Sequence, residues 1–138
     1  LYEFELGTPY SKVIGHLVRA HQKFSFHKVF VDQTGVGEPV LEELQNQGMK
    51  NVEGLTFTVK TKEELLTCLK IAMEQKRLKM PYHLRLCQQI NEQQYEYTKS
   101  GHLAFSHPVG SHDDMLWALS LGVWSSTREA PSRLVRAW

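Results

Sequence analysis

Residues 27–37 read HKVFVDQTGVG, and this stretch decides the fold. Its apolar run, Val29-Phe30-Val31, predicts a central strand covered on both faces. Asp32 ends that strand, and Gly35 and Gly37 predict a tight turn directly after it. In open α/β sheets, ligands bind beyond the carboxyl ends of the strands, so Asp32 is the first candidate functional residue.

Outward from this stretch, the chain alternates strand and helix patterns. A strand followed by a helix, repeated, indicates an α/β domain with a largely parallel sheet. Thr8 is expected to cap the first helix with Pro9 as its first residue, and Ser111 to cap the last one. The expected strands are residues 1–6, 27–32, 51–58 and a hairpin of 95–98 with 102–106, and the later helices are residues 39–48, 61–76, 83–92 and 112–124.

The composition is that of one globular domain: 138 residues, 41% hydrophobic and 22% charged. The longest apolar stretch, residues 115–124, is too short to cross a bilayer, which excludes a membrane protein. Glu3 and Glu5 lie where a secretory leader needs apolar residues, so we expect no secretion. Two cysteines exclude a disulfide scaffold and favour a reducing compartment. A net charge of +1 neither indicates nor excludes nucleic-acid binding.

The motif of residues 32–37 admits several functions. Asp32 could be a metal ligand, a general base, a helix cap or a group that only orders the turn. The motif is no Walker loop, no dinucleotide fingerprint and no aspartic-protease motif. Two interpretations stay open: a glycine turn that approaches phosphate, as in actin-like kinases, and a metal-binding carboxylate beside a nucleic-acid backbone.

A second acidic group, His112-Asp113-Asp114, is predicted to begin the most buried helix. Acidic residues at a helix start also have a simpler explanation, because they offset the helix dipole. Adjacent helical side chains point about 100° apart, so at most one of the two aspartates aims well at a given ion. His112 could support a ligand, move protons or cap the helix. If these aspartates meet Asp32, the clustered carboxylates need a cation, and Mg²⁺ or Mn²⁺ suits oxygen ligands.

The motifs in this order resemble a known family. They are VDQTGVG at 31–37, GLTFT at 54–58, Lys62 at a helix start, LKMP at 78–81 and HDDMLWAL at 112–119. The series resembles the C-terminal nuclease domain of the large terminase subunit of tailed viruses, over residues 1–122. The resemblance implies a three-layer RNase H-like α/β fold, with helices flanking a central mixed sheet. It implies a nuclease domain at residues 1–124 that lacks its first strands, and an Arg-rich tail at 125–138.

The resemblance also implies a function and a site. The function is an endonuclease that cuts concatemeric double-stranded DNA during genome packaging, by a mechanism with two Mg²⁺ or Mn²⁺ ions. Asp32 and either Asp113 or Asp114 are the implied metal ligands, and His112 is a catalytic candidate beside them. The turn residues next to this site are Thr34, Gly35 and Gly37, and the candidate DNA contacts are Lys60, Lys62 and Lys79.

The implied setting is the packaging machinery in the host-cell cytoplasm. The implied partners are double-stranded DNA, the terminase ATPase domain, the small terminase subunit and the portal protein. The family carries a further acid on its first strand, which this sequence begins too late to contain, so the activity of the chain alone stays open. Two alternatives remain: a catalytically incomplete RNase H-like module that docks DNA or a partner, and an actin-like nucleotide-binding domain.

Overall fold

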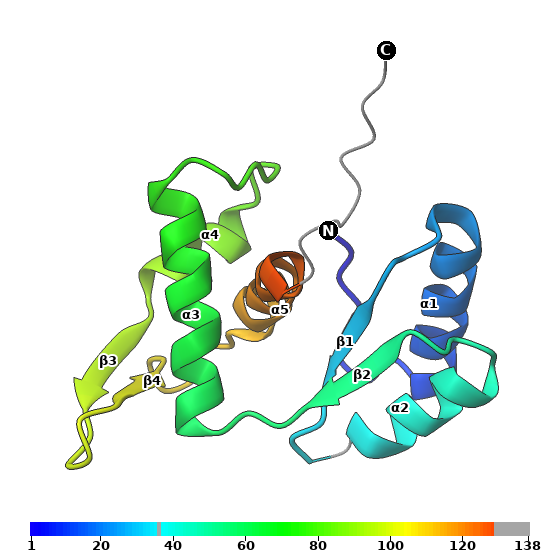
Figure 1. Ribbon diagram of the computed structural model, residues 1–138, viewed down its shortest axis with the longest axis horizontal. Coiled ribbons are helices and arrows are strands. Elements are labelled where there is room, and N and C mark those ends of the chain that lie inside the picture. Colours follow the sequence, from blue (N-terminus) through cyan, green and yellow to red (C-terminus); the bar gives the residue numbers. More distant parts are fainter. Residues whose placement is uncertain (36, 129–138) are drawn as a thin grey trace. The chain divides into compact units, whose positions relative to one another are not determined.

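The computed structural model describes residues 1–35 and 37–128 and divides the chain into two compact units (Figure 1). The first unit comprises residues 1–58, and the second begins at Val59. Each unit has its own strands, helices and buried side chains, and each is described by itself.

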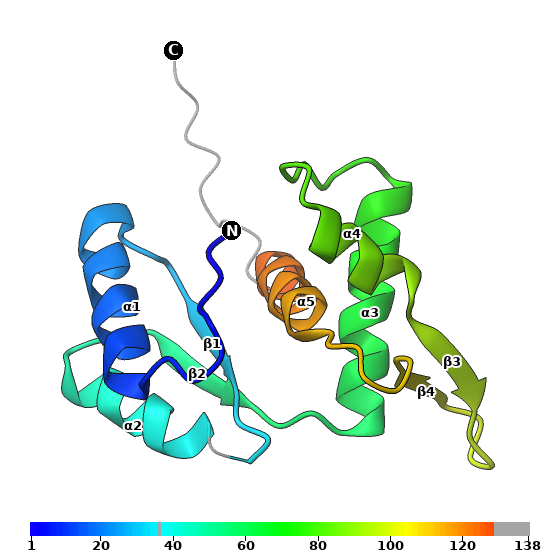
Figure 2. The ribbon, with the colours of Figure 1, turned by 180° about the vertical axis from the view of Figure 1, so that it is seen from behind.

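The first unit is a parallel strand pair with two helices. Strand β1 (Val29–Asp32) pairs with β2 (Val52–Leu55), and the intervening chain contains helix α2 (Gly37–Asn46). Helix α1 (Tyr10–Phe24) precedes β1 and packs on α2 (Figure 2). The helical spacing of apolar residues in α1 places them toward a core, as predicted. That core comprises Ile14, Leu44, Met49 and Val52, with Leu17, Val18, Val29, Val31, Val40 and Leu41 packed against it.

The second unit combines three helices with a hairpin. Helix α3 (Val59–Glu74) packs along α5 (Asp114–Arg128), and α4 (Leu84–Asn91) packs on α5 as well. Strands β3 (Gln94–Tyr97) and β4 (Leu103–Ser106) form the predicted antiparallel hairpin, and β4 contacts α3 (Figures 1 and 2). The described strands thus form one parallel and one antiparallel pair, where the sequence predicted a single mixed sheet.

Helix α5 supplies most of the core of the second unit, as its apolar sequence predicted. Its buried residues are Met115, Leu116, Trp117, Ser120, Leu121, Val123 and Trp124. The helix continues to Arg128, four residues beyond its predicted end. The hydroxyls of Ser126 and Thr127 donate to the carbonyls of Val123 and Trp124 within this last turn. Of the predicted tail, residues 129–138 lie outside the described part of the chain.

The predictions for the first residues were wrong in two respects. Residues 1–6 do not form a strand; instead the rings of Tyr2 and Phe4 pack against His16 of α1, with centroids 4.0 and 5.3 Å from it. Thr8 does not cap α1, because its hydroxyl donates to the carbonyl of Glu5 at 2.7 Å and Pro9 occupies the N-cap position.

Other helix boundaries moved by a few residues. Helix α2 begins at Gly37, two residues before the predicted Pro39, and α3 begins at Val59 instead of residue 61. His83 caps α4 by accepting from the backbone nitrogen of Leu86. None of the described helices combines the length and the apolar character that a membrane span requires.

Candidate metal centre

Asp32 stands at the end of β1, as predicted, and its exposed carboxylate orders the turn that follows. Its Oδ1 accepts a hydrogen bond from the backbone nitrogen of Thr34 at 2.8 Å. The Thr34 hydroxyl in turn accepts from the backbone nitrogen of Phe57 at 2.8 Å, which ties the turn to the chain beyond β2. One carboxylate oxygen of Asp32 is therefore used in shaping the turn, and the interactions described for the chain give Oδ2 no such role.

Each of the two glycines of the motif is required for a different structural reason. Gly35 has a φ of +91°, a left-handed conformation that side chains with a Cβ rarely adopt. Gly37 is buried at the start of α2, where a Cβ would overlap the carbonyl oxygen of Asp32. Glycine at 37 thus lets α2 begin directly against the backbone of Asp32 and fixes where that residue lies.

The second acidic group lies at the start of α5, where its three members differ in environment. The Asp113 side chain is only 15% exposed, whereas Asp114 and His112 are exposed. Gln93 Nε2 donates to Asp113 Oδ2 at 3.3 Å, and His107 Nε2 lies 3.8 Å from Asp113 Oδ1. Of the two aspartates, Asp113 alone has a side chain held in place by described contacts from two other segments.

Two glutamines, one in α4 and one just beyond its end, organise the start of α5, and sequence reasoning missed both. Buried Gln89 accepts from the backbone nitrogen of Leu116 through Oε1 at 3.0 Å, which satisfies a first-turn donor of α5. Gln93, four residues later, holds Asp113. The prediction that Ser111 caps α5 was wrong, because its hydroxyl donates to the carbonyl of Pro108 at 2.8 Å.

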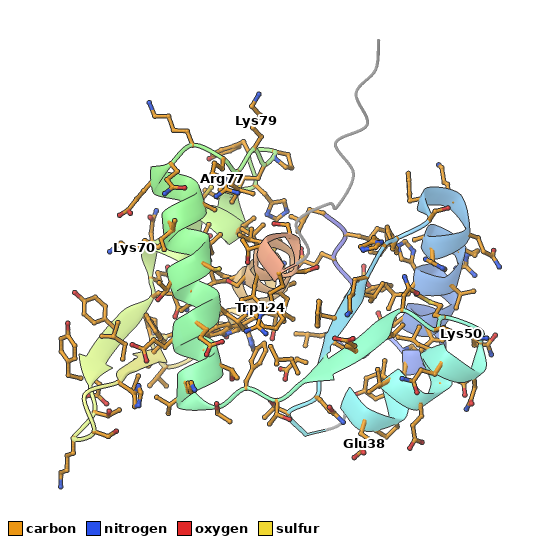
Figure 3. The ribbon with its side chains drawn as sticks, viewed as in Figure 1. Glu38, Lys50, Lys70, Arg77, Lys79 and Trp124 are labelled. Atoms are coloured by element: carbon orange, nitrogen blue, oxygen red, sulfur yellow. The ribbon has the colours of Figure 1, made fainter. Side chains whose placement is uncertain are left out.

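The predicted DNA-contacting lysines occupy different surroundings. Lys62 is half-buried, with Nζ 5.0 Å from the ring centroid of Trp117, a cation–π arrangement one turn into α5. Lys60 is exposed in the first turn of α3. Lys79 is exposed beyond the other end of that helix (Figure 3), whose 16 residues span about 24 Å. The three lysines therefore do not form one cluster.

The described residues contain no group of three or more histidine, cysteine or acidic side chains that could hold a metal ion. Asp32 belongs to the first unit, and Asp113 and Asp114 belong to the second. The local geometry is a carboxylate at a strand end in one unit and a supported carboxylate at a buried helix start in the other.

Comparison with known proteins identifies the family. A family model described as the terminase RNase H-like domain matches residues 14–125. The chain belongs to the terminase RNase H-like domain family. The match includes Asp32, Asp113 and Asp114, and the predicted family is confirmed.

The relatives of this terminase domain are phage proteins. The large terminase subunit of Thermus phage G20c is 25% identical over 115 residues, which are 83% of this chain and 24% of that protein. Two crystal structures of the large terminase nuclease from phage G20c, one with bound cobalt and one with bound magnesium, superpose with a TM-score of 0.73 at 27% identity. They match 86% of this chain, which covers 63% and 62% of theirs. The RNase H-like α/β fold is therefore confirmed, and the chain spans about a quarter of the full-length relative.

Proposed function

We propose that this terminase domain is a metal-dependent endonuclease that hydrolyses the phosphodiesters of double-stranded viral DNA. The observation that carries the proposal is the Asp113 carboxylate, which is half-buried at the start of a buried helix and held by Gln93. Solvated helix-start acids need no such support. The same activity is supported by the two similar crystal structures of a large terminase nuclease, one with bound cobalt and one with bound magnesium.

The residues of this chain fit a hard divalent cation. Carboxylate oxygens are the ligands that Mg²⁺ and Mn²⁺ prefer. Gln93 Oε1, adjacent to Asp113, is buried and lacks a hydrogen-bond partner among the described residues. A buried acceptor beside a carboxylate suits the hydration water that Mg²⁺ retains. Asp32 and Asp113 are the proposed ligands, with Asp114 and His112 in supporting roles.

In the proposed reaction, water attacks the phosphodiester directly and the 3′ oxygen leaves. Two divalent ions at such a site supply an activated water and stabilise charge on the leaving oxygen. Asp32 and Asp113 contribute negative charge at fixed positions, and the Thr34 and Gly37 contacts keep Asp32 in place. The lysines 60, 62 and 79 provide positive charge for the DNA backbone.

The proposed setting is genome packaging in the cytoplasm of the host cell. The substrate is concatemeric DNA, and the proposed partners are the terminase ATPase domain, the small terminase subunit and the portal protein. The large terminase subunit of phage G20c, of which this chain matches a part, supports this assignment.

The test is plasmid cleavage by the chain with Mn²⁺ or Mg²⁺, using Asp32→Asn. Asparagine keeps an oxygen that accepts from Thr34, so the turn persists and only the charge is lost. Glu38→Gln, an exposed acid at the start of α2 (Figure 3), is the matched control. We expect Asp32→Asn to abolish cleavage and Glu38→Gln to retain it.

Two other outcomes have clear meanings. Cleavage that persists in Asp32→Asn rules out its role. If the unchanged chain cuts with neither ion, the proposed nuclease activity of this chain is wrong, and the alternative of a module that docks DNA or a partner is favoured.

A further inference from the structure

The glutamine pair at the end of α4 has a consequence for the proposed site. Gln89 and Gln93 lie four residues apart, and both reach the start of α5. Gln89 binds the helix backbone at Leu116, whereas Gln93 binds a side chain, the Asp113 carboxylate. The first contact fixes where α5 begins, and the second fixes the orientation of one acid on it.

We propose that Gln93 is a positioning residue for metal binding and that it makes Asp113, not Asp114, the metal ligand of this helix. The inference rests on the proposed function. Gln93 donates through Nε2 to Asp113 Oδ2 and thereby limits rotation of that carboxylate. A ligand held in one orientation loses less conformational entropy when an ion binds. Exposed Asp114 has no comparable support described for it.

The other end of the Gln93 amide supports the same assignment. Its Oε1 is buried and without a hydrogen-bond partner among residues 1–35 and 37–128. A buried polar atom left unpaired costs about 1–3 kcal/mol, so such an atom calls for a ligand that completes it. We assign Oε1 as the acceptor for a water molecule of the bound ion. One amide thus orients the carboxylate with its nitrogen and accepts from the hydration shell with its oxygen.

His107 supports the same carboxylate from the loop that follows β4. Its Nε2 lies 3.8 Å from Asp113 Oδ1, and its Nδ1 lies 3.2 Å from the Ser111 hydroxyl. Because the Ser111 hydroxyl donates to the carbonyl of Pro108, it orders the loop and is not poised as a nucleophile. Gln93 and His107 therefore approach Asp113 from two loops, and Gln93 makes the hydrogen bond.

The test is Mn²⁺ affinity of the chain, measured by titration calorimetry, in Gln93→Leu. Leucine fills similar space and removes both polar atoms. The same substitution at its exposed neighbour, Gln94→Leu, is the matched control. Loss of a group that orients a metal ligand weakens metal binding about 10–100-fold, so we expect at least about a ten-fold loss in Gln93→Leu and none in Gln94→Leu. The metal-free Tm of the two variants should agree within about 3 °C.

Further variants separate the possible failures. Gln93→Asn keeps an amide but shortens it, so it tests the contact if Gln93→Leu folds poorly, and we expect it also to weaken binding. Asp113→Asn should abolish Mn²⁺ binding, whereas Asp114→Asn should weaken it less. If Asp113→Asn loses Mn²⁺ while both Gln93 variants bind like the control, the positioning role is wrong. Loss of Mn²⁺ in Asp114→Asn but not in Asp113→Asn overturns the ligand assignment. If the unchanged chain does not bind Mn²⁺, or if Asp32→Asn and Asp113→Asn bind it normally, the proposed function itself fails.

Discussion

Replacing Gln89 by alanine should destabilise the second unit strongly for a single polar substitution. Gln89 is 8% exposed, and its Oε1 accepts from Leu116 N at 3.0 Å, where Leu116 is 1% exposed. Without this acceptor a buried backbone donor loses its partner, which costs about 1–3 kcal/mol. The vacated space adds to that cost, so we expect a loss of about 2–3 kcal/mol in the free energy of unfolding.

The measurement is thermal unfolding followed by near-ultraviolet circular dichroism, because Trp117 and Trp124 of α5 report on this helix. A loss of about 2–3 kcal/mol lowers Tm by roughly 10–20 °C in a unit of this size. Gln88→Ala, on an exposed position of the same helix, is the control and should melt within about 2 °C of the unchanged chain. If Gln89→Ala melts at the same temperature as Gln88→Ala, the hydrogen bond from Leu116 to Gln89 does not stabilise the start of α5.

Two further predictions concern the first unit. Gly37→Ala should lower the free energy of unfolding by about 1–3 kcal/mol and reduce cleavage, because the new Cβ overlaps the Asp32 carbonyl. The control is Gly122→Ala, whose Cβ meets nothing within 4 Å, and it should be neutral or slightly stabilising. Urea unfolding measures both variants. Leu44→Ala, at a fully buried core position, should destabilise the chain by about 2–5 kcal/mol in the same measurement, and a loss below about 1 kcal/mol would contradict the described core.

Much of the layout followed from local sequence patterns. The strand before Asp32, the glycine turn after it and the hairpin around Gly101 were all predicted, because each depends on residues close together in the chain. The prediction that this strand is central and covered on both faces is not confirmed: among the described strands β1 pairs only with β2, and its three apolar residues are half-buried. The alternation of apolar and acidic residues at 1–6 gave a wrong strand prediction. Such alternation fits a half-exposed strand, but a strand also needs a neighbouring strand to pair with.

The supports of the candidate site were not predictable in this way. Gln89 and Gln93 contact residues 27 and 20 positions later in the sequence, and no local period signals such a contact. Ser111 satisfied the usual preference for a capping residue, yet its hydroxyl is committed to the carbonyl of Pro108. The spacing of the two glutamines at a helix end is the one signal that could have suggested a shared target.

The lysines illustrate a different limit. A lysine at a helix start predicts a solvated charge or a phosphate contact, but the ring of Trp117 lies 5.0 Å from Lys62 Nζ. Because the sequence does not specify which aromatic ring faces which cation across two helices, this pairing needed the structure. The contact places the Lys62 ammonium group against α5, and its DNA role stays a prediction.

The proposal that most needs a test is that Asp32 and Asp113 are both ligands of the bound metal ion. The most direct measurement is a double-mutant cycle of Mn²⁺ affinity with Asp32→Asn, Asp113→Asn and both together. If they share an ion, each single variant loses most of the affinity and the double variant loses little more than either. Losses that simply add, each confined to its own binding event, would contradict the shared site.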